Sequence, residues 1–268
     1  RLLAENITHG YIFSIGVEED WEKYLSEFGK AFEDYVNSLF ESISEHQNFD
    51  LNKNYKIKTI KGDEKEIDNV ITQENTIIIV EAKAKWLKDE NLHTENPYAY
   101  SDELIKKYSE SEGKNQLINS IDRISRFYKP KPKDIYSILT VYDEHLYCET
   151  DYKILLKEFY RNLNMTNDTD SYPESFEYNE TIVHAPIILN INDIEYLESI
   201  KDILNLFDLI IEYAKAFTTR NPSFYEYLHL KLYVIGEGLW SGRQRPSIAF
   251  REFYSKMQIN HIIKNINQ

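Results

Sequence analysis

Cysteine is almost missing from this chain, because Cys148 is the only one among 268 residues. A single cysteine excludes a disulfide framework within the chain and fits a reducing compartment, so we expect a cytoplasmic protein. The seven histidines are scattered, without the HxH or HExxH spacing that zinc sites use. Zinc chemistry is therefore a poor explanation of this sequence.

Long apolar segments are missing as well. Runs such as TIIIV, residues 76–80, stay far below the roughly 20 residues that cross a bilayer, so no membrane association is expected. The first ten residues, RLLAENITHG, lack the basic-then-apolar layout of a signal peptide. They also lack an initiator methionine, and we expect that upstream residues were removed or left out.

Basic residues are outnumbered, with 31 Lys and Arg against 45 Asp and Glu and a net charge of −14. This balance argues against a protein that coats nucleic acid indiscriminately, because duplex binding needs a basic face. It does not exclude a nuclease, since the carboxylates of such a site hold cations. A basic stripe can also lie on an otherwise acidic surface.

Hydrophobic periodicity predicts an α/β chain. From residue 192 the pattern is helical, opened by NDIE (192–195) as a capping box. We therefore predict a core of residues 1–191 and a helical C-terminal region, residues 192–268, packed on it as part of the same domain or as a second one. The expected core elements are helices over 18–46, 113–128 and 152–163, with Gly29 starting a second helix or marking a tight crossing, and strands over 54–60, 66–72, 75–85, 134–143 and 181–191.

One strand end carries an unusual pair of charged side chains. Glu81 and Lys83 directly follow the run TIIIV, and residues two apart on a strand share a face. Asp68 lies on the preceding strand, at hairpin distance. The chain contains four acidic-x-Lys triplets, but only Glu81-Ala-Lys83 has this context. Carboxylates beside a lysine can hold a divalent cation and orient water for phosphodiester hydrolysis.

Two helices complete the pattern. Glu33 lies beside the apolar face of the helix before the hairpin, and Gln116 lies in the helix after it. In order and spacing, these residues with Asp68, Glu81 and Lys83 resemble the PD-(D/E)XK nuclease superfamily over roughly residues 25–145. The Pro-Asp of that signature is Ile-Asp here, and the stretch looks more like the Mrr-type and defence-associated branches.

The resemblance implies a restriction endonuclease-like fold, a mixed central sheet flanked by helices, here with a C-terminal helical extension. It also implies Mg²⁺-dependent cleavage of DNA, mainly double-stranded and in defence against foreign DNA, with Mn²⁺ as a substitute. Asp68 and Glu81 would bind the cation, and Glu33 would add a carboxylate directly or through water. Lys83 would orient the attacking water and stabilise charge, and Gln116 would position water, metal or phosphate.

The assignments of Asp68 and Lys83 have alternative candidates in the sequence. Glu66 shares a face with Asp68 and is a more serious rival than Asp63, which requires a shift of the strand register. Lys85 shares the face of Lys83 and is a second candidate for the lysine role. The same side chains also have simpler explanations, as helix-surface residues (Glu33, Gln116) or as a solvated ion pair (Glu81 with Lys83).

Two basic segments could contact phosphates. One is the segment of residues 235–246, through Arg243 and Arg245, although a plain loop is the favoured interpretation of it. The other is the densest basic run, which could also be a solvated helix face; it comprises Lys114, Arg123, Arg126, Lys129, Lys131 and Lys133.

The acidic charge predicts that DNA binding requires self-association or a larger complex, so we expect a homo-oligomer or a subunit. Two other functions stay open. The chain could be a non-catalytic nucleic-acid-binding or scaffold subunit that kept the nuclease fold, or an RNase toxin on the same fold.

Overall fold

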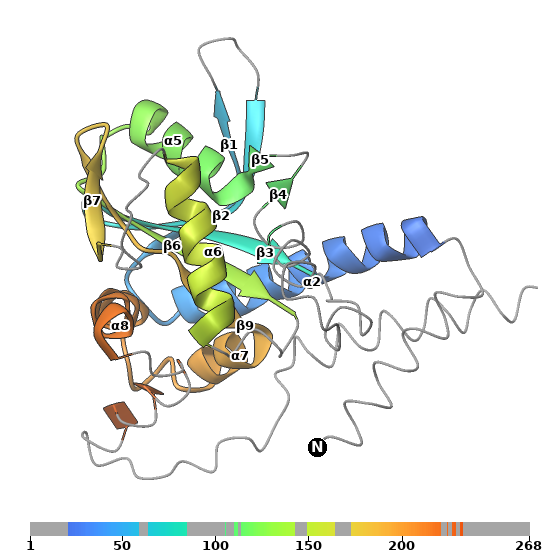
Figure 1. Cartoon of the computed structure of the whole chain (residues 1–268). Coiled ribbons are helices and arrows are strands. Elements are labelled where there is room, and N and C mark those ends of the chain that lie inside the picture. Colours follow the sequence, from blue (N-terminus) through green and yellow to red (C-terminus); the bar gives the residue numbers. More distant parts are fainter. Residues whose placement is uncertain are drawn as a thin grey trace, which may run out of the picture.

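The computed structural model has a seven-stranded sheet with helices on both of its faces (Figure 1). It describes residues 21–58, 64–84, 105, 110–111, 114–142, 149–163, 173–220, 224, 227–228 and 231–232. The predicted fold class, a mixed sheet flanked by helices with further helices after it, is confirmed. No helix among these residues is long and apolar enough to span a bilayer.

The first three strands form an antiparallel meander of β1 (Asp50–Lys58), β2 (Glu64–Gln73) and β3 (Thr76–Lys83). The β2–β3 hairpin turns through Glu74 and Asn75, with Gln73 paired to Thr76. β3 then pairs in parallel with β6 (Asp134–Val141), from Thr76 opposite Asp134 to Lys83 opposite Val141. The crossover between these two strands carries α5 (Gln116–Phe127), as parallel pairing requires.

The far side of β6 is shared by two short strands, whereas a single strand over 181–191 was expected. β8 (Thr181–His184) pairs in parallel with the first residues of β6, and β9 (Ile187–Asn190) pairs with the last. Pro186 separates them, and proline cannot donate a ladder hydrogen bond. β7 (Ser175–Tyr178), which the pattern did not predict, forms the edge of the sheet beside β8. A separate two-stranded pair consists of β4 (Glu110–Ser111) and β5 (Lys114–Asn115).

Each face of the sheet packs against its own helices. Successive residues of β3 alternate between the two cores, with Ile77 and Ile79 in one and Ile78 and Val80 in the other. The core of Ile77 and Ile79 contains α5 and α6 (Glu149–Asn162). The opposite core contains α2 (Trp21–Ser44), α7 (Ile191–Ser199) and α8 (Leu206–Arg220). The result is a three-layer α/β/α arrangement, visible in Figure 1.

α2 runs without interruption through Gly29, so neither the second helix nor the tight crossing expected there occurs. Its apolar stripe is the predicted one, with Phe28, Phe32 and Val36 buried. The rings of Phe28 and Phe32 pack edge-on against Tyr142, with centroid distances of 5.1 and 5.7 Å. Because Tyr142 directly follows β6, these contacts anchor α2 at the end of the sheet where β3 and β6 finish.

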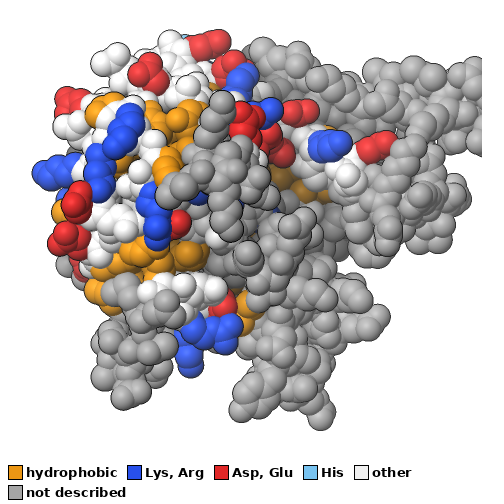
Figure 2. Space-filling model, turned by 90° about the horizontal axis from the view of Figure 1, so that it is seen from above, with side chains coloured by type: hydrophobic (Ala, Val, Ile, Leu, Met, Phe, Trp, Pro, Cys, Tyr) orange, Lys and Arg blue, Asp and Glu red, His pale blue; other side chains and the backbone are white. Residues whose placement is uncertain are grey.

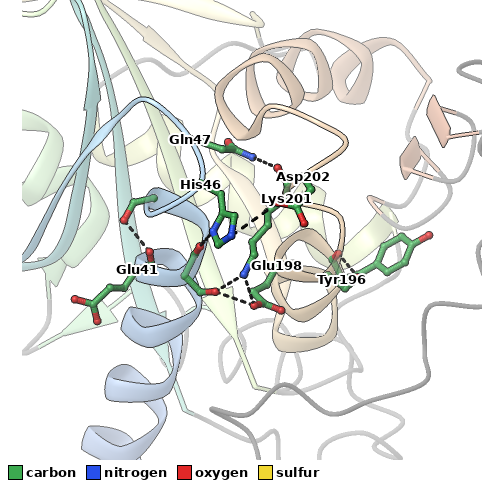
Figure 3. Close-up of polar contacts among 10 residues, drawn as sticks. Glu41, His46, Gln47, Tyr196, Glu198, Lys201 and Asp202 are labelled. Atoms are coloured by element: carbon green, nitrogen blue, oxygen red, sulfur yellow. Dashed lines mark hydrogen bonds and ion pairs between the residues drawn. The ribbon is translucent and has the colours of Figure 1, made fainter.

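The C-terminal end of α2 is fastened to α7 and the turn after it by polar contacts (Figure 3). Ser42 donates to Glu198 at 2.8 Å, and Lys201 donates to both of them at 2.6 and 2.9 Å. The Gln47 amide donates to the carbonyls of Lys201 and Leu204 at 2.9 and 2.8 Å. α7 therefore packs against α2, while the division of the chain at residues 191 and 192 stays a prediction.

α7 begins one residue before the expected start. Its capping box is formed by Asn190 and Asp193, each accepting a backbone N–H of the other at 2.9 to 3.0 Å. The box predicted over residues 192–195 is therefore wrong, because Ile191 is already helical and β9 passes directly into α7.

Candidate active site

Glu81 and Lys83 lie at the end of β3, on the face that packs against α5. They continue the alternation of Ile77 and Ile79, so four side chains of β3 point to the same layer. Glu81 has no exposed surface at all, whereas Lys83 is half-buried. A carboxylate without solvent must find its hydrogen bonds inside the protein. The hydrogen-bond partners of Glu81 therefore show which residues lie against this end of the sheet.

Both oxygens of Glu81 accept hydrogen bonds from α5. Gln116 Nε2 donates to Glu81 Oε2 at 2.6 Å, and Ser120 Oγ donates to Glu81 Oε1 at 2.6 Å. The carbonyl oxygen of Gln116 accepts a hydrogen bond from Lys83 Nζ. The Gln116 side chain therefore bridges Glu81 and Lys83, with its amide orientation set by one acceptor and one donor. Gln116 is the first residue of α5, so the start of that helix lies over the end of β3.

Asp68 reaches the same strand end from β2. The β2–β3 ladder runs from Gln73 opposite Thr76 only to Asn69 opposite Val80. One step beyond, Asp68 Oδ2 accepts the backbone N–H of Ala82 at 2.7 Å. A side-chain carboxylate thus binds the backbone between Glu81 and Lys83.

Glu33 is brought alongside by α2. Four residues further along that helix, Asn37 accepts a hydrogen bond from the side chain of Asn69, the neighbour of Asp68 on β2. Asn37 and Asn69 are both buried. Residues four apart lie on one face of a helix, so this contact holds Glu33 on the side of α2 that faces Asp68.

The three carboxylates repel one another. Burial, followed by the charges of Asp68 and Glu66, raises the pKa of Glu33 to about 7. Burial and then the charge of Asp68 raise the pKa of Glu81. The pKa of Asp68 is raised mainly by burial, although the hydrogen bond from Ala82 and the charge of Lys83 act against it. Lys83 lowers the pKa of all three carboxyl groups, but burial and mutual repulsion outweigh it.

This donor set suits a hard divalent cation. Magnesium prefers oxygen ligands, is held by one or two carboxylates and keeps several waters. A bound divalent cation would also compensate the negative charge of the three carboxylates, which Lys83 alone does not neutralise. Within the described residues, however, no three or more His, Cys, Asp and Glu side chains are grouped as metal ligands. The structure thus brings Asp68, Glu81 and Lys83 to one strand end, with Glu81 oriented towards α5 rather than towards a carboxylate cage.

The structure distinguishes Asp68 from Glu66, the alternative carboxylate on the same strand. Glu66 is exposed, and its charge acts on Glu33 and Asp68 from outside. Asp63 and Lys85 lie outside the described residues, as do Arg243 and Arg245. Glu66 is therefore a neighbour of the site, and Asp68 is the residue that contacts the β3 backbone.

The last two lysines of the basic run, Lys131 and Lys133, lie away from these residues. Lys131 and Lys133 precede β6, and the backbone N–H of Lys133 donates to Asn75 in the β2–β3 turn. Asn75 precedes Glu81 by six residues, which is about 20 Å at the usual rise of a strand. Part of the run is also paired with acidic groups, Arg126 with Asp122 and Lys131 with Glu180. Figure 2 shows basic, acidic and apolar side chains intermixed over the described part of the face that it views.

Three residues of this region escaped the sequence analysis: Ser120, Asn37 and Asn69. Each is a buried polar residue. The available signal was spacing, because Ser120 follows Gln116 by four residues and Asn37 follows Glu33 by four. A polar residue at such a position on a buried helix face needs a partner, and the site provides one.

Comparisons with known proteins give little beyond this geometry. No protein-family model matches the chain, and no curated protein matches it significantly. Among solved structures, the small subunit of the heterodimeric restriction endonuclease R.BspD6I superposes with a TM-score of 0.35 and 13% sequence identity. The alignment covers 79% of this chain and 96% of that subunit. A TM-score this low carries no argument about this chain, so the resemblance to the PD-(D/E)XK superfamily stays a resemblance of motif residues.

Proposed function

We propose that this protein is a metal-dependent endonuclease that hydrolyses DNA phosphodiester bonds. The observation that carries the proposal is the hydrogen-bonded chain from Glu81 through Gln116 to Lys83, with Asp68 bound one residue away. A surface ion pair would not need a fully buried carboxylate or a bridging amide. The arrangement therefore favours a site over a solvated strand end.

Asp68 and Glu81 are the residues that would hold Mg²⁺ or Mn²⁺, and Glu33 would add a third carboxylate directly or through water. A bound divalent cation would supply polarisation of the scissile phosphate and activation of water. The chain's contribution is to hold two carboxylates at one strand end, with Asp68 fixed by Ala82. A cation would bind Glu81 Oε2 through the other lone pair of that oxygen, or would displace the Gln116 amide that now donates to it.

Lys83 supplies the positive charge of the site. Its ammonium lies on the same strand face as Glu81 and is steered by the Gln116 carbonyl oxygen. In this position it can orient an attacking water and stabilise the negative charge that develops on the phosphate. Gln116 has two parts to play, since its carbonyl oxygen directs Lys83 while its amide group is free to turn to water or phosphate once a cation displaces it from Glu81.

Duplex DNA is the substrate that the superfamily resemblance favours, with defence against foreign DNA as the setting and the cytoplasm as the location. The net charge of −14 and the paired lysines and arginines near β6 do not provide a strong phosphate-binding face on the described residues. We therefore propose that cleavage requires a partner, either a second copy of this chain or another subunit.

Plasmid cleavage tests the proposal. The purified protein should nick or linearise plasmid DNA with Mg²⁺ or Mn²⁺, and lose that activity in a chelator. Single-stranded DNA and tRNA assayed in parallel would separate an RNase from a DNase. A protein that cuts none of these substrates at any concentration, alone or mixed with its natural partners, would contradict the proposal.

A second candidate is a non-catalytic subunit with a nuclease fold. It is favoured by one observation, that both oxygens of Glu81 are already bound by Gln116 and Ser120. Binding of Mn²⁺ measured by calorimetry distinguishes the two. An endonuclease should bind it through Asp68 and Glu81, whereas a scaffold has no need of it.

A further inference from the structure

Ser120 is a buried residue of α5 in contact with Glu81. It is 1% exposed, and its hydroxyl donates to Glu81 Oε1 at 2.6 Å. It sits one helical turn after Gln116, whose amide holds the other carboxylate oxygen. The two donors therefore approach Glu81 from one face of the same helix.

The two contacts differ in how easily they can be exchanged. Ser120 is enclosed in the helix–sheet core, beside the buried side chains of Leu117, Ile121 and Ile124. Gln116 is only half-buried, stands at the first position of the helix and is shared with Lys83. A ligand arriving at the strand end can thus displace the glutamine amide without opening the core, while the serine hydroxyl stays in place.

We infer that Ser120 is a positioning residue, whose hydroxyl keeps Glu81 Oε1 inside the core so that Oε2 is the oxygen offered to the divalent cation. The inference rests on the proposed function and deepens it by assigning separate tasks to the two oxygens of Glu81. Ser120 touches neither cation nor substrate in this scheme. It acts through Glu81, by holding the carboxylate in one orientation. Without this contact, the carboxylate would have to adopt that orientation when the cation binds.

The chain offers a matched control on the same helix. Ser125 is also 1% exposed, but its hydroxyl donates to the backbone carbonyl of Asp122 at 3.0 Å and contacts no residue of the site. Replacing either serine by alanine removes one buried hydroxyl from α5. A general effect of such a loss on the helix should appear in both variants. An effect that acts through Glu81 should appear only in Ser120→Ala.

The experiment is Mn²⁺ titration of the full chain by calorimetry, without DNA, for the unchanged protein, Ser120→Ala and Ser125→Ala. Loss of a residue that orients a metal ligand weakens metal affinity by about 10- to 100-fold. We expect a loss of this size for Ser120→Ala and a change below about twofold for Ser125→Ala. Ser120→Thr, which keeps the hydroxyl, should restore most of the affinity.

The outcomes are separable. If the unchanged protein binds no Mn²⁺, the proposed function fails and this inference fails with it. If the unchanged protein and Ser120→Ala bind Mn²⁺ equally, only the role of Ser120 is overturned. Thermal unfolding of each variant shows whether it is folded. Should Ser120→Ala not fold, Ser120→Cys takes its place, because it keeps a side chain of the same connectivity and replaces a strong donor by a weak one.

Discussion

Asp68 binds the backbone of the neighbouring strand at Ala82, where its Oδ2 accepts the N–H at 2.7 Å. The contact falls just beyond the last paired residues of the β2–β3 ladder. It fixes the end of β3 at Ala82, the residue that lies between Glu81 and Lys83. The carboxylate thus has a structural partner through one oxygen, and substitutions at Asp68 can separate that role from its charge.

Asp68→Asn should keep the fold and lose metal binding. The asparagine carbonyl oxygen can still accept from Ala82, but the negative charge is gone. Mn²⁺ at about 100 times its Kd should stabilise the unchanged protein by about 2.7 kcal/mol, because it binds only the folded state. Thermal unfolding with and without Mn²⁺ should show this gain for the unchanged protein and for Asp50→Asn, an exposed control on β1. An undiminished gain in Asp68→Asn would remove Asp68 from the ligand set.

Lys83→Ala should strongly slow cleavage while leaving Mn²⁺ binding in place. Removing one group that stabilises developing charge lowers kcat by about 10²- to 10³-fold. Cleavage rates on plasmid DNA, with calorimetric Mn²⁺ affinity beside them, measure the two effects separately. Lys56→Ala, at an exposed position of β1, is the matched control and should cut at the original rate. Equal rates for the two variants would assign the lysine role elsewhere, with Lys85 as the next candidate.

Glu33 should make the metal-free protein less stable as the pH rises. Its pKa is about 7 in the folded chain against an ordinary 4.5, so the folded state binds the proton more tightly than the unfolded state. Stability is therefore greatest below pH 4.5 as far as this group is concerned, and it declines as the pH rises through about 7. Because the group is only half-buried, the decline should be on the order of 1 kcal/mol.

Glu33→Gln tests this dependence by removing the titrating group. Urea unfolding of the metal-free protein between pH 5 and pH 8 should give a flatter profile for this variant than for the unchanged chain. Glu27→Gln, an exposed position on the same helix, should leave the profile as it is. A profile of unchanged slope in Glu33→Gln would mean that Glu33 does not share the electrostatic field of Asp68.

Ile78→Ala should strongly destabilise the fold. Ile78 has no exposed surface and belongs to the core between the sheet and α2. Cutting a fully buried isoleucine to alanine costs about 2 to 5 kcal/mol, through lost burial and the cavity left behind. Ile182 on β8 is 37% exposed, so Ile182→Ala should cost under about 1 kcal/mol. Denaturant midpoints of the two variants give the comparison, and similar losses would contradict the layer arrangement.

Local pattern determined much of the layout. The β-branched run of β3 and the charged residues after it predicted a strand with Glu81 and Lys83 on one face, because side-chain direction alternates with each residue. Alternation also predicted the β2–β3 hairpin, and the spacing of three and four residues predicted the apolar stripe of α2. It failed where one residue changes the backbone, as at Pro186, which divides a predicted single strand into β8 and β9.

Tertiary packing decided which side chains meet. No pattern in the chain states that Ser120 binds Glu81 or that Asn37 binds Asn69, because each pair joins elements 30 to 40 residues apart. Packing also placed Lys131 and Lys133 by the β2–β3 turn, at the end of the sheet opposite Glu81. The physical reason is that periodicity depends on neighbours along the chain, whereas the position of a helix over a sheet depends on how two buried surfaces fit. The roles of Glu33, Asp68, Glu81, Lys83 and Gln116 in catalysis thus remain predictions that the sequence raised and the arrangement of α2, α5 and β3 makes testable.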